Sequence, residues 1–457
     1  MFEIVSPLVV SFNRISKTRF PSCLIPLLFN DLIQDHIGTT GMRTFILFFF
    51  GLLLSASPAS AQKMLVFMDL EQQDHLKAYG IAFEALEQGY TVEWLLNYRG
   101  GSFVMDPTTD RVRACYLRGV SFKVIDGAEL VRIYAHIEEN NMDRVLLEKA
   151  PEIAVYTRPD KRPWDDAVTM ALEYAEVPYK TIFDTEVLTG ELKQYDWLHL
   201  HHEDFTGQYS KFYSYHRTPW YQQQQATDET LARTLGYPTV AEAKKAVAQG
   251  IKAYVGNGGF LFAMCAATET LEIALASART DIVAPEYDHT PVDPDAQSKL
   301  DFGQTFAFEN FTLQLNPLIG SFSNIDVNQV NAGKVMTGPF TLFDFSAKYD
   351  PVPTMLTQSH VNYIAGFYGL STSFHRDVLK RTVVVLAEEA GTDHVKYIHG
   401  NYGRGTFTFY GGHDPEDEEH LVGDPPTNLA LHKNSPGYRL ILNNVLFPAA
   451  KKKKRKT

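Results

Sequence analysis

Short apolar runs alternate with amphipathic stretches along most of the chain, and this alternation restricts its fold more than any other feature. The runs at residues 153–157 and 179–183 flank a helical pattern over 164–175, and the run at 260–264 leads directly into a helical pattern over 267–278. Strands that are joined by helices usually pair in parallel within one sheet. The sequence therefore predicts an α/β fold with a doubly wound, mainly parallel sheet.

The same alternation suggests how the chain is divided. Residues 62–150 are expected to form an N-terminal α/β domain that ends with a helix over 128–149, and residues 151–448 are expected to carry the main sheet. Residues 279–377 are rich in Asp, Pro, Gly and aromatic side chains and lack long periodic elements, which predicts an insertion of loops and short strands. Residues 449–457 form a basic tail.

Residues 1–61 have the composition of a leader that precedes the folded protein. Residues 42–61 begin with Met-Arg, continue through an apolar run and end in Ala-Ser-Ala, which is the pattern of a secretory signal peptide. The apolar run at 45–54 would span only about 15 Å as a helix, roughly half of a bilayer core. We therefore expect cleavage before Gln62, export to the periplasm or beyond, and no transmembrane segment in the mature chain.

Charge and cysteine content exclude two classes of protein. The chain carries a formal net charge of −12, which disfavours binding to the phosphates of nucleic acid. Of three cysteines, Cys23 lies in the leader, so Cys115 and Cys265 remain. Two cysteines exclude a disulfide-rich scaffold, although one disulfide between them stays open in an oxidising compartment.

Cys265 is the strongest candidate for chemistry. It stands between the apolar run 260–264 and the helical pattern that begins at Ala267, with the small residues Ala263 and Ala266 beside it. A cysteine at such a strand-to-helix turn lies at a helix N-terminus, where N–H groups and the helix dipole lower the thiol pKa and can bind an oxyanion. The position favours a nucleophile, and a buried unreactive cysteine is the alternative.

A second candidate segment ends a later apolar run with Gly-Gly-His413-Asp414-Pro-Glu416. A histidine with carboxylates beside it has what a general base and its orienting partner require. The segment predicts a base at His413, and a hydrogen-bonded loop histidine is the alternative.

Three further polar residues, His201, His202 and Glu203, stand at the carboxyl end of the run 196–201. Ligands bind at this end of the strands in open parallel sheets, so we expect these side chains to share a crevice with the cysteine and the second histidine. Period-two spacing also places His199 on one face with His201 and Glu203, a possible metal-ligand set. Because His199 lies inside the strand, where a core role is commoner, we favour a site without metal.

The order of these segments resembles the class I glutamine amidotransferase-like superfamily, in which a cysteine elbow follows a glycine turn and a late strand ends in Gly-Gly-His and an acid. The resemblance covers about residues 151–447. It implies a flavodoxin-like fold, with Cys265 as nucleophile, His413 as base and Glu416 or Asp414 as the third member.

The chain departs from the family pattern around the elbow. Ala263 and Ala267 take the places of glycines, and Glu269 stands where a glutamine usually follows, which places Glu269 in the expected binding site. Residues 75–80 and 94–103 also resemble exported proteins labelled asparagine synthetase B. The chain lacks that enzyme's Ser-Gly-Gly-x-Asp-Ser loop for ATP, and cleavage would expose Gln62 instead of a cysteine, so we expect no such activity.

Two functions fit these features. In the first, an exported cysteine-dependent hydrolase or amidohydrolase uses Cys265 to attack a carbonyl, His413 to move the proton, and backbone N–H groups after the cysteine to hold the oxyanion. In the second, a non-catalytic protein of the cell envelope binds a ligand or partner in the same crevice. The ligand would be a small molecule, a sugar or a peptide, and neither function requires a cofactor. The expected binding residues are His201, His202, Glu203 and Glu269.

Overall fold

The computed structural model describes residues 62–159, 166–327, 338–367, 371–417 and 425–450. The expected signal peptide at 42–61, the leader before it and the lysine-rich residues of the tail lie outside this part. Among the described residues, no helix is long and apolar enough to cross a membrane.

The first sheet of the described chain has five strands in the order β4-β1-β3-β2-β5, and every neighbouring pair is antiparallel. Its strands are β1 (Lys63–Val66), β2 (Val92–Leu96), β3 (Ser102–Met105), β4 (Phe122–Ile125) and β5 (Asp143–Leu147). Its helices are α2 (His75–Glu87), α3 (Thr109–Arg118) and α4 (Gly127–Glu139).

The expectation of a helix over residues 128–149 is confirmed for the first half of this range and wrong for the second half. Helix α4 ends at Glu139, and residues 143–147 pair with β2 as strand β5. The break falls at Asn140 and Asn141, whose short polar side chains favour turns over helix interiors.

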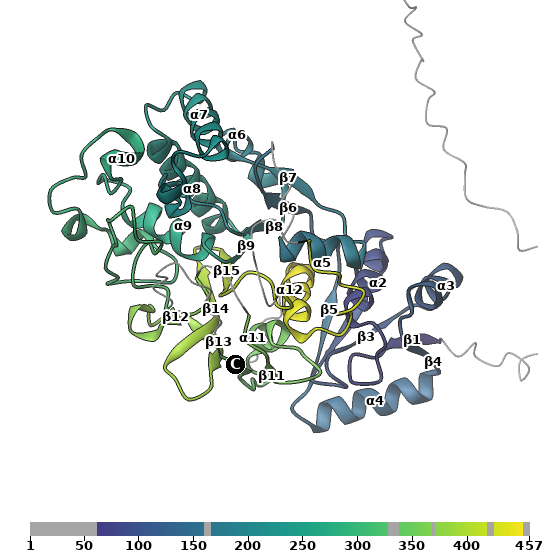
Figure 1. Ribbon diagram of the computed structural model, residues 1–457. Helices are drawn as coiled ribbons and strands as arrows, with labels where there is room; N and C mark the ends of the chain where they lie inside the picture. The colour runs from purple at the N-terminus through teal and green to yellow at the C-terminus, as the bar shows by residue number, and fades with distance from the viewer. Residues whose placement is uncertain (1–61, 160–165, 328–337, 368–370, 418–424, 451–457) are drawn as a thin grey trace, which may run out of the picture. The chain divides into compact units, whose positions relative to one another are not determined.

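The second sheet has ten strands, and nine of them follow the order β11-β10-β13-β14-β15-β9-β8-β6-β7 (Figure 1). The parallel strands are β6 (Ile153–Tyr156), β7 (Lys180–Ile182), β8 (Trp197–Leu200), β9 (Phe260–Met264) and β15 (Gly405–Tyr410). The antiparallel strands are β10 (Phe340–Leu342), β11 (Tyr363–Ile364), β12 (Phe374–His375), β13 (Val384–Glu389) and β14 (His394–Tyr402). The fold is therefore α/β, and its sheet is partly parallel instead of mainly parallel as expected. The pairs among β10 to β14 are antiparallel, and a tight turn instead of a helix joins β14 to β15.

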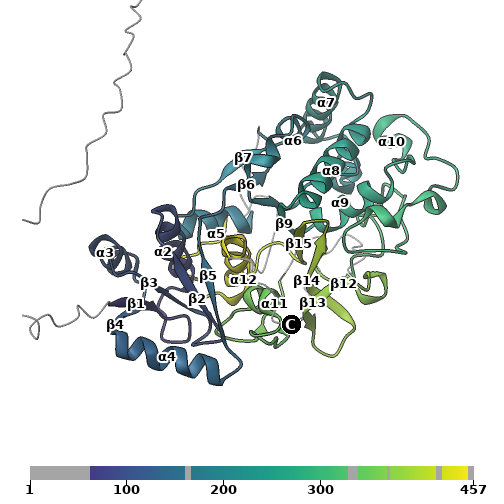
Figure 2. The same ribbon diagram turned by 180° about the vertical axis from the view of Figure 1, so that it is seen from behind.

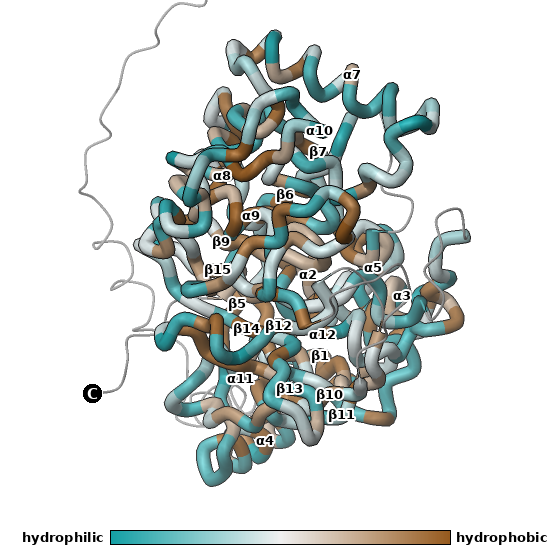
Figure 3. The backbone as a smooth tube through the Cα atoms, turned by 60° about the vertical axis from the view of Figure 1, so that its left-hand side comes forward, coloured by the Kyte–Doolittle hydropathy of each residue, from teal (hydrophilic) through white to brown (hydrophobic). Residues whose placement is uncertain are grey.

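Helices cover both faces of the parallel strands. Phe260 and Phe262 of β9 point into one core with α5 (Ala167–Ala175) and α12 (Pro436–Leu446), whereas Leu261 and Ala263 point into another core with α8 (Val240–Gly256) and α9 (Ala267–Ala276). This alternation is what a strand buried on both faces requires. Figure 2 shows α5 and α12 beside α2, and Figure 3 shows the hydrophilic colouring of α7 (Pro219–Thr234).

Between residues 279 and 377, the described elements are short. They include α10 (Pro285–Asp288), α11 (Pro351–Leu356) and strands β10 to β12. Phe306 and Phe308 from this segment pack into the same core as α8 and α9, so the segment covers that side of the sheet.

A buried arginine joins α12 to the first sheet. The Arg439 guanidinium donates to the carbonyls of Met68 (2.7 Å) and Gly100 and to the hydroxyl of Tyr79 (3.1 Å). These carbonyls and this hydroxyl satisfy a cation that burial would otherwise destabilise strongly. Arg439 therefore brings together the segments around residues 75–80, 94–103 and 438–444.

Gly80 on α2 marks a close helix contact that a larger residue cannot enter. A Cβ at this position would lie 1.9 Å from the carbonyl oxygen of Ala175 in α5. We expect Gly80→Ala to lower the free energy of unfolding by about 2 kcal/mol, because the clash outweighs the better helix propensity of alanine. Urea unfolding should show this loss, whereas Gly256→Ala, whose Cβ would meet nothing closer than 3.4 Å, should unfold near the wild-type midpoint. Equal midpoints for both variants would contradict the packing argument.

Candidate functional site

Cys265 occupies a strained turn between β9 and α9. Its φ is 49°, a left-handed conformation that costs a non-glycine residue on the order of 1–3 kcal/mol. Two backbone hydrogen bonds hold the turn: the Cys265 N–H donates to the Gly412 carbonyl (3.0 Å), and the Ala267 N–H donates to the His201 carbonyl (2.9 Å). The expected strand, turn and helix around Cys265 are therefore confirmed.

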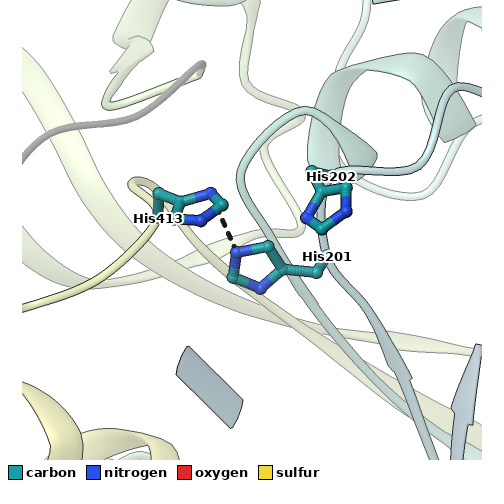
Figure 4. Close-up of side chains that lie close together, drawn as sticks. All are labelled: His201, His202 and His413. Carbon is teal, nitrogen blue, oxygen red and sulfur yellow. Dashed lines mark hydrogen bonds between the residues drawn. The ribbon is translucent and has the colours of Figure 1, made fainter. Parts of the chain in front are cut away.

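The neighbouring strands β8, β9 and β15 bring His201, Cys265 and His413 together at their carboxyl ends. The Nδ1 atom of His413 lies 3.4 Å from Cys265 Sγ and 3.0 Å from His201 Nε2. All three side chains are buried, while His202 beside them is half-buried. Figure 4 shows His201 and His202 facing His413 from the end of β8.

Both described cysteines are free thiols. The disulfide between Cys115 and Cys265, which the sequence left open, is therefore not formed. Burial raises the pKa of the Cys115 thiol to about 12, which makes this thiol unreactive at neutral pH. Cys265, in contrast, has the ring nitrogen of His413 beside its sulfur.

Asp166 lies behind the histidines and faces the ring nitrogens of His199 and His201. Its Oδ1 caps α5 by accepting from the N–H groups of Val168 and Thr169, and it lies 3.4 Å from His199 Nε2 and 3.6 Å from His201 Nδ1. Although burial alone would raise the pKa of Asp166, the imidazoles of His201 and His199 hold it below its usual value.

Burial lowers the pKa of His201 well below its usual value, so this imidazole is neutral at pH 7. We assign its proton to Nδ1, which faces the Asp166 carboxylate, and its lone pair to Nε2, which faces His413 Nδ1. The His201 lone pair therefore stabilises any state in which His413 Nδ1 carries a proton. One such state is the pair in which His413 has taken the proton of Cys265.

One N–H group at the turn has no backbone acceptor among the described residues. The N–H groups of Cys265 and Ala267 are engaged by backbone carbonyls, whereas that of Ala266 makes no hydrogen bond to another described residue. Ala266 caps α9, where the helix dipole adds partial positive charge.

The acids expected to orient His413 are engaged elsewhere. Asp414 accepts from the hydroxyl of Thr427 (2.7 Å) and from the backbone N–H of Glu416 (2.9 Å). The Glu416 carboxylate lies 3.0 Å from Nδ1 of His432. The group that the structure places on His413 Nδ1 is instead His201, backed by Asp166.

The two glutamates expected in the binding site face other clusters. Glu203 is half-buried, and burial raises its pKa to about 7 against the opposing charges of Lys244 and Arg158. Glu269 accepts from the hydroxyls of Ser323 (2.5 Å) and Ser371 (3.1 Å). Of the four expected binding residues, only His201 and His202 lie together with His413.

Sequence reasoning missed Asp166. The sequence placed Asp166 inside the helical pattern expected over 164–175, whereas the helix begins at Ala167 and Asp166 is its N-cap. Aspartate is a preferred N-cap residue, so a helix start at Ala167 could have been recognised from the sequence. The contact of Asp166 with His199 and His201 depends on the pairing of β6 with β8, which no local signal reveals.

Comparison with known proteins adds little to this geometry. No protein-family model and no curated protein matches the chain. Among solved structures, the cytoplasmic protein STM3548 from Salmonella typhimurium is similar at 12% identity, with 68% of this chain and 91% of that chain covered and a TM-score of 0.32. The cytoplasmic protein STM1381 from Salmonella typhimurium LT2 is similar at 13% identity, with 66% of this chain and 100% of that chain covered and a TM-score of 0.32.

Proposed function

We propose that the protein is a cysteine-dependent hydrolase that cleaves a C–N bond, with Cys265 as nucleophile and His413 as the group that moves the proton. The observation that carries the proposal is the strained turn at Cys265, which holds Sγ 3.4 Å from His413 Nδ1. Backbone strain of this kind persists where the surrounding structure fixes a functional geometry.

In the proposed reaction, His413 takes the thiol proton of Cys265, and Sγ attacks the carbonyl carbon of the substrate. The Ala266 N–H stabilises the oxyanion, as one donor of this kind does in acyl transfer. The C–N bond then breaks while His413 gives its proton to the leaving nitrogen. Water attacks the remaining thioester with His413 as base, the C–S bond breaks, and the acid leaves as the thiol regains its proton.

The amidotransferase-like, flavodoxin-like assignment belongs to the same proposal. In chain order, the parallel strands β6, β7, β8, β9 and β15 are arranged as 2-1-3-4-5, which is the flavodoxin-like order. The candidate site at the carboxyl ends of its inner strands supports this assignment. We further propose that residues 42–61 direct export, on the sequence pattern alone.

A non-catalytic binding protein is the second candidate, and the burial of the thiol favours it. Cys265 is 1% exposed, so a substrate could reach Sγ only after side chains or loops move. A binding protein would need no such access to Cys265.

Alkylation of the folded protein near pH 7 tests the proposal. We expect iodoacetamide to label Cys265 at least ten times faster in the wild type than in His413→Ala, because His413 stabilises the thiolate. The rate should be followed by mass spectrometry of the peptide that contains Cys265. Slow labelling at the same rate in both proteins would contradict the hydrolase.

Two further variants serve as controls for the labelling. Cys265→Ser reports the background from Cys115, whose raised pKa should keep it unreactive. His136→Ala removes an exposed histidine of α4 and should label at the wild-type rate.

A further inference from the structure

Three histidines converge at one point beside the thiol. His201 and His202 follow β8, His413 follows β15, and each offers one ring nitrogen such that the three nitrogens lie within 4.8 Å of one another. Figure 4 shows the three rings around a common centre. A thiol and a base require only Cys265 and His413, so the hydrolase does not account for the position of His202.

The spacing of these atoms fits a small tetrahedral ion. With ordinary zinc bond lengths, two nitrogen ligands lie about 3.3 Å apart, and a nitrogen and a sulfur ligand lie about 3.6 Å apart. The structure places His201 Nε2 3.0 Å from His413 Nδ1, and Cys265 Sγ 3.4 Å from the same Nδ1. These two pairs of atoms would need to separate by only a few tenths of an ångström to hold an ion, and the nitrogen of His202 lies within 4.8 Å of the other two histidine nitrogens.

The group behind His201 is the one that metal sites use. Metal-bound histidines usually give their second ring N–H to a carboxylate, which fixes the ring and directs the other lone pair at the metal. Asp166 faces His201 Nδ1 from this side at 3.6 Å, without a hydrogen bond to it, and its Oδ1 accepts from the N–H groups of Val168 and Thr169. Asp166 therefore supports the site from outside and is not itself a ligand.

We infer that His201, His202 and His413 form a zinc-type metal site, with Cys265, whose Sγ lies 3.4 Å from His413 Nδ1, as the fourth ligand. Three imidazoles and one thiolate suit Zn²⁺ and other borderline or soft ions, whereas Mg²⁺ and Ca²⁺ require oxygen ligands. A bound ion would coordinate His413 Nδ1 and the thiolate of Cys265, so the base and the nucleophile would both be occupied. Metal binding and thiol nucleophilicity at this site therefore exclude each other.

Titration of the tag-free mature protein with Zn²⁺, in competition with a chromophoric chelator, tests the site. We expect one ion per chain in the wild type and a loss of affinity of at least tenfold in His202→Ala, whose half-buried side chain can be removed with little risk to folding. His136→Ala is the matched control and should bind as the wild type does. Absence of stoichiometric binding, or equal affinity in His202→Ala, would overturn the site.

Co²⁺ tests the fourth ligand separately. The Co²⁺-loaded wild type should show a thiolate-to-metal charge-transfer band that Cys265→Ser loses while its ligand-field bands remain. A spectrum without the charge-transfer band in the wild type would overturn Cys265 as a ligand.

The metal site and the hydrolase fail in different experiments. Alkylation of the metal-free protein reports on the thiol and the base, and Zn²⁺ titration reports on His202, which the hydrolase does not use. If both proposals hold, one equivalent of Zn²⁺ should slow alkylation of the wild type at least tenfold, and a chelator should restore the rate.

Discussion

Asp166→Ala is expected to lower the free energy of unfolding by about 3 kcal/mol. The carboxylate caps α5 through the N–H groups of Val168 and Thr169, and the loss of an N-cap costs about 1 kcal/mol. The same oxygen faces the ring nitrogens of His199 and His201, which burial leaves without water. Neither ring nitrogen makes a hydrogen bond at these distances, so the further loss is that of a buried charge facing two imidazoles, about 1–3 kcal/mol more. Urea unfolding at pH 7 measures the total.

Two variants separate these contributions. Asp126→Ala removes an exposed cap of α4, whose carboxylate accepts only from the Glu129 N–H among described partners, and should cost about 1 kcal/mol. Asp166→Asn keeps a good capping side chain and loses the charge, so it should fall between the wild type and Asp166→Ala. If Asp166→Ala lost no more than Asp126→Ala, the carboxylate would be a helix cap alone.

Local patterns predicted the part of the fold that depends on local signals. The run 260–264 is strand β9 with the same bounds, and a helix begins at Ala267 as expected. The apolar run, the small residues and the cysteine all lie within one short segment, so the sequence alone located the turn at Cys265. Parallel strands place their carboxyl ends at one edge, which also brought His201 and His413 to the cysteine.

Features that depend on distant pairing could not be predicted. The antiparallel strands β10 to β13 lie in or after the long segment without periodicity. Their places in the sheet follow from pairing between distant segments, because β12 and β13 pair with β14, β10 pairs with β13, and β11 pairs with β10. Asp414 and Glu416 adjoin His413 in sequence, yet the structure turns them toward Thr427 and His432. Adjacency along the chain does not decide which way a side chain points after a glycine turn.

Glu269→Gln is expected to reverse a pH-dependent loss of stability. Burial, together with the nearby carboxylate of Asp326, raises the pKa of Glu269 from 4.5 to about 8. The folded protein therefore holds Glu269 neutral at pH 7, where its oxygens meet the hydroxyls of Ser323 and Ser371. These serines belong to the segment over residues 279–377, so Glu269 ties that segment to α9, one turn after Cys265.

The sign of the effect follows from the raised pKa. Because the folded protein binds this proton more tightly than the unfolded chain, the contribution of neutral Glu269 is complete below pH 4.5 and is lost as pH rises through about 8. Between these two pH values, the shift in the pKa of Glu269 changes the free energy of unfolding by about 4–5 kcal/mol. Glutamine has the same shape, stays neutral and can both accept from and donate to the two hydroxyls.

Urea unfolding of the two proteins at pH 5, 7 and 9 compares Glu269 with its neutral replacement. Titrating groups that do not interact with Glu269 cancel in the difference, and the coupled carboxylate of Asp326 contributes with Glu269. The two proteins should have similar stability at pH 5, and Glu269→Gln should be the more stable by several kcal/mol at pH 9. A difference that stays constant across this range would mean that Glu269 is ionised in the folded protein. The serine hydroxyls would then stabilise a carboxylate beside Asp326, and α9 would hold the segment through charge instead of through a neutral acid.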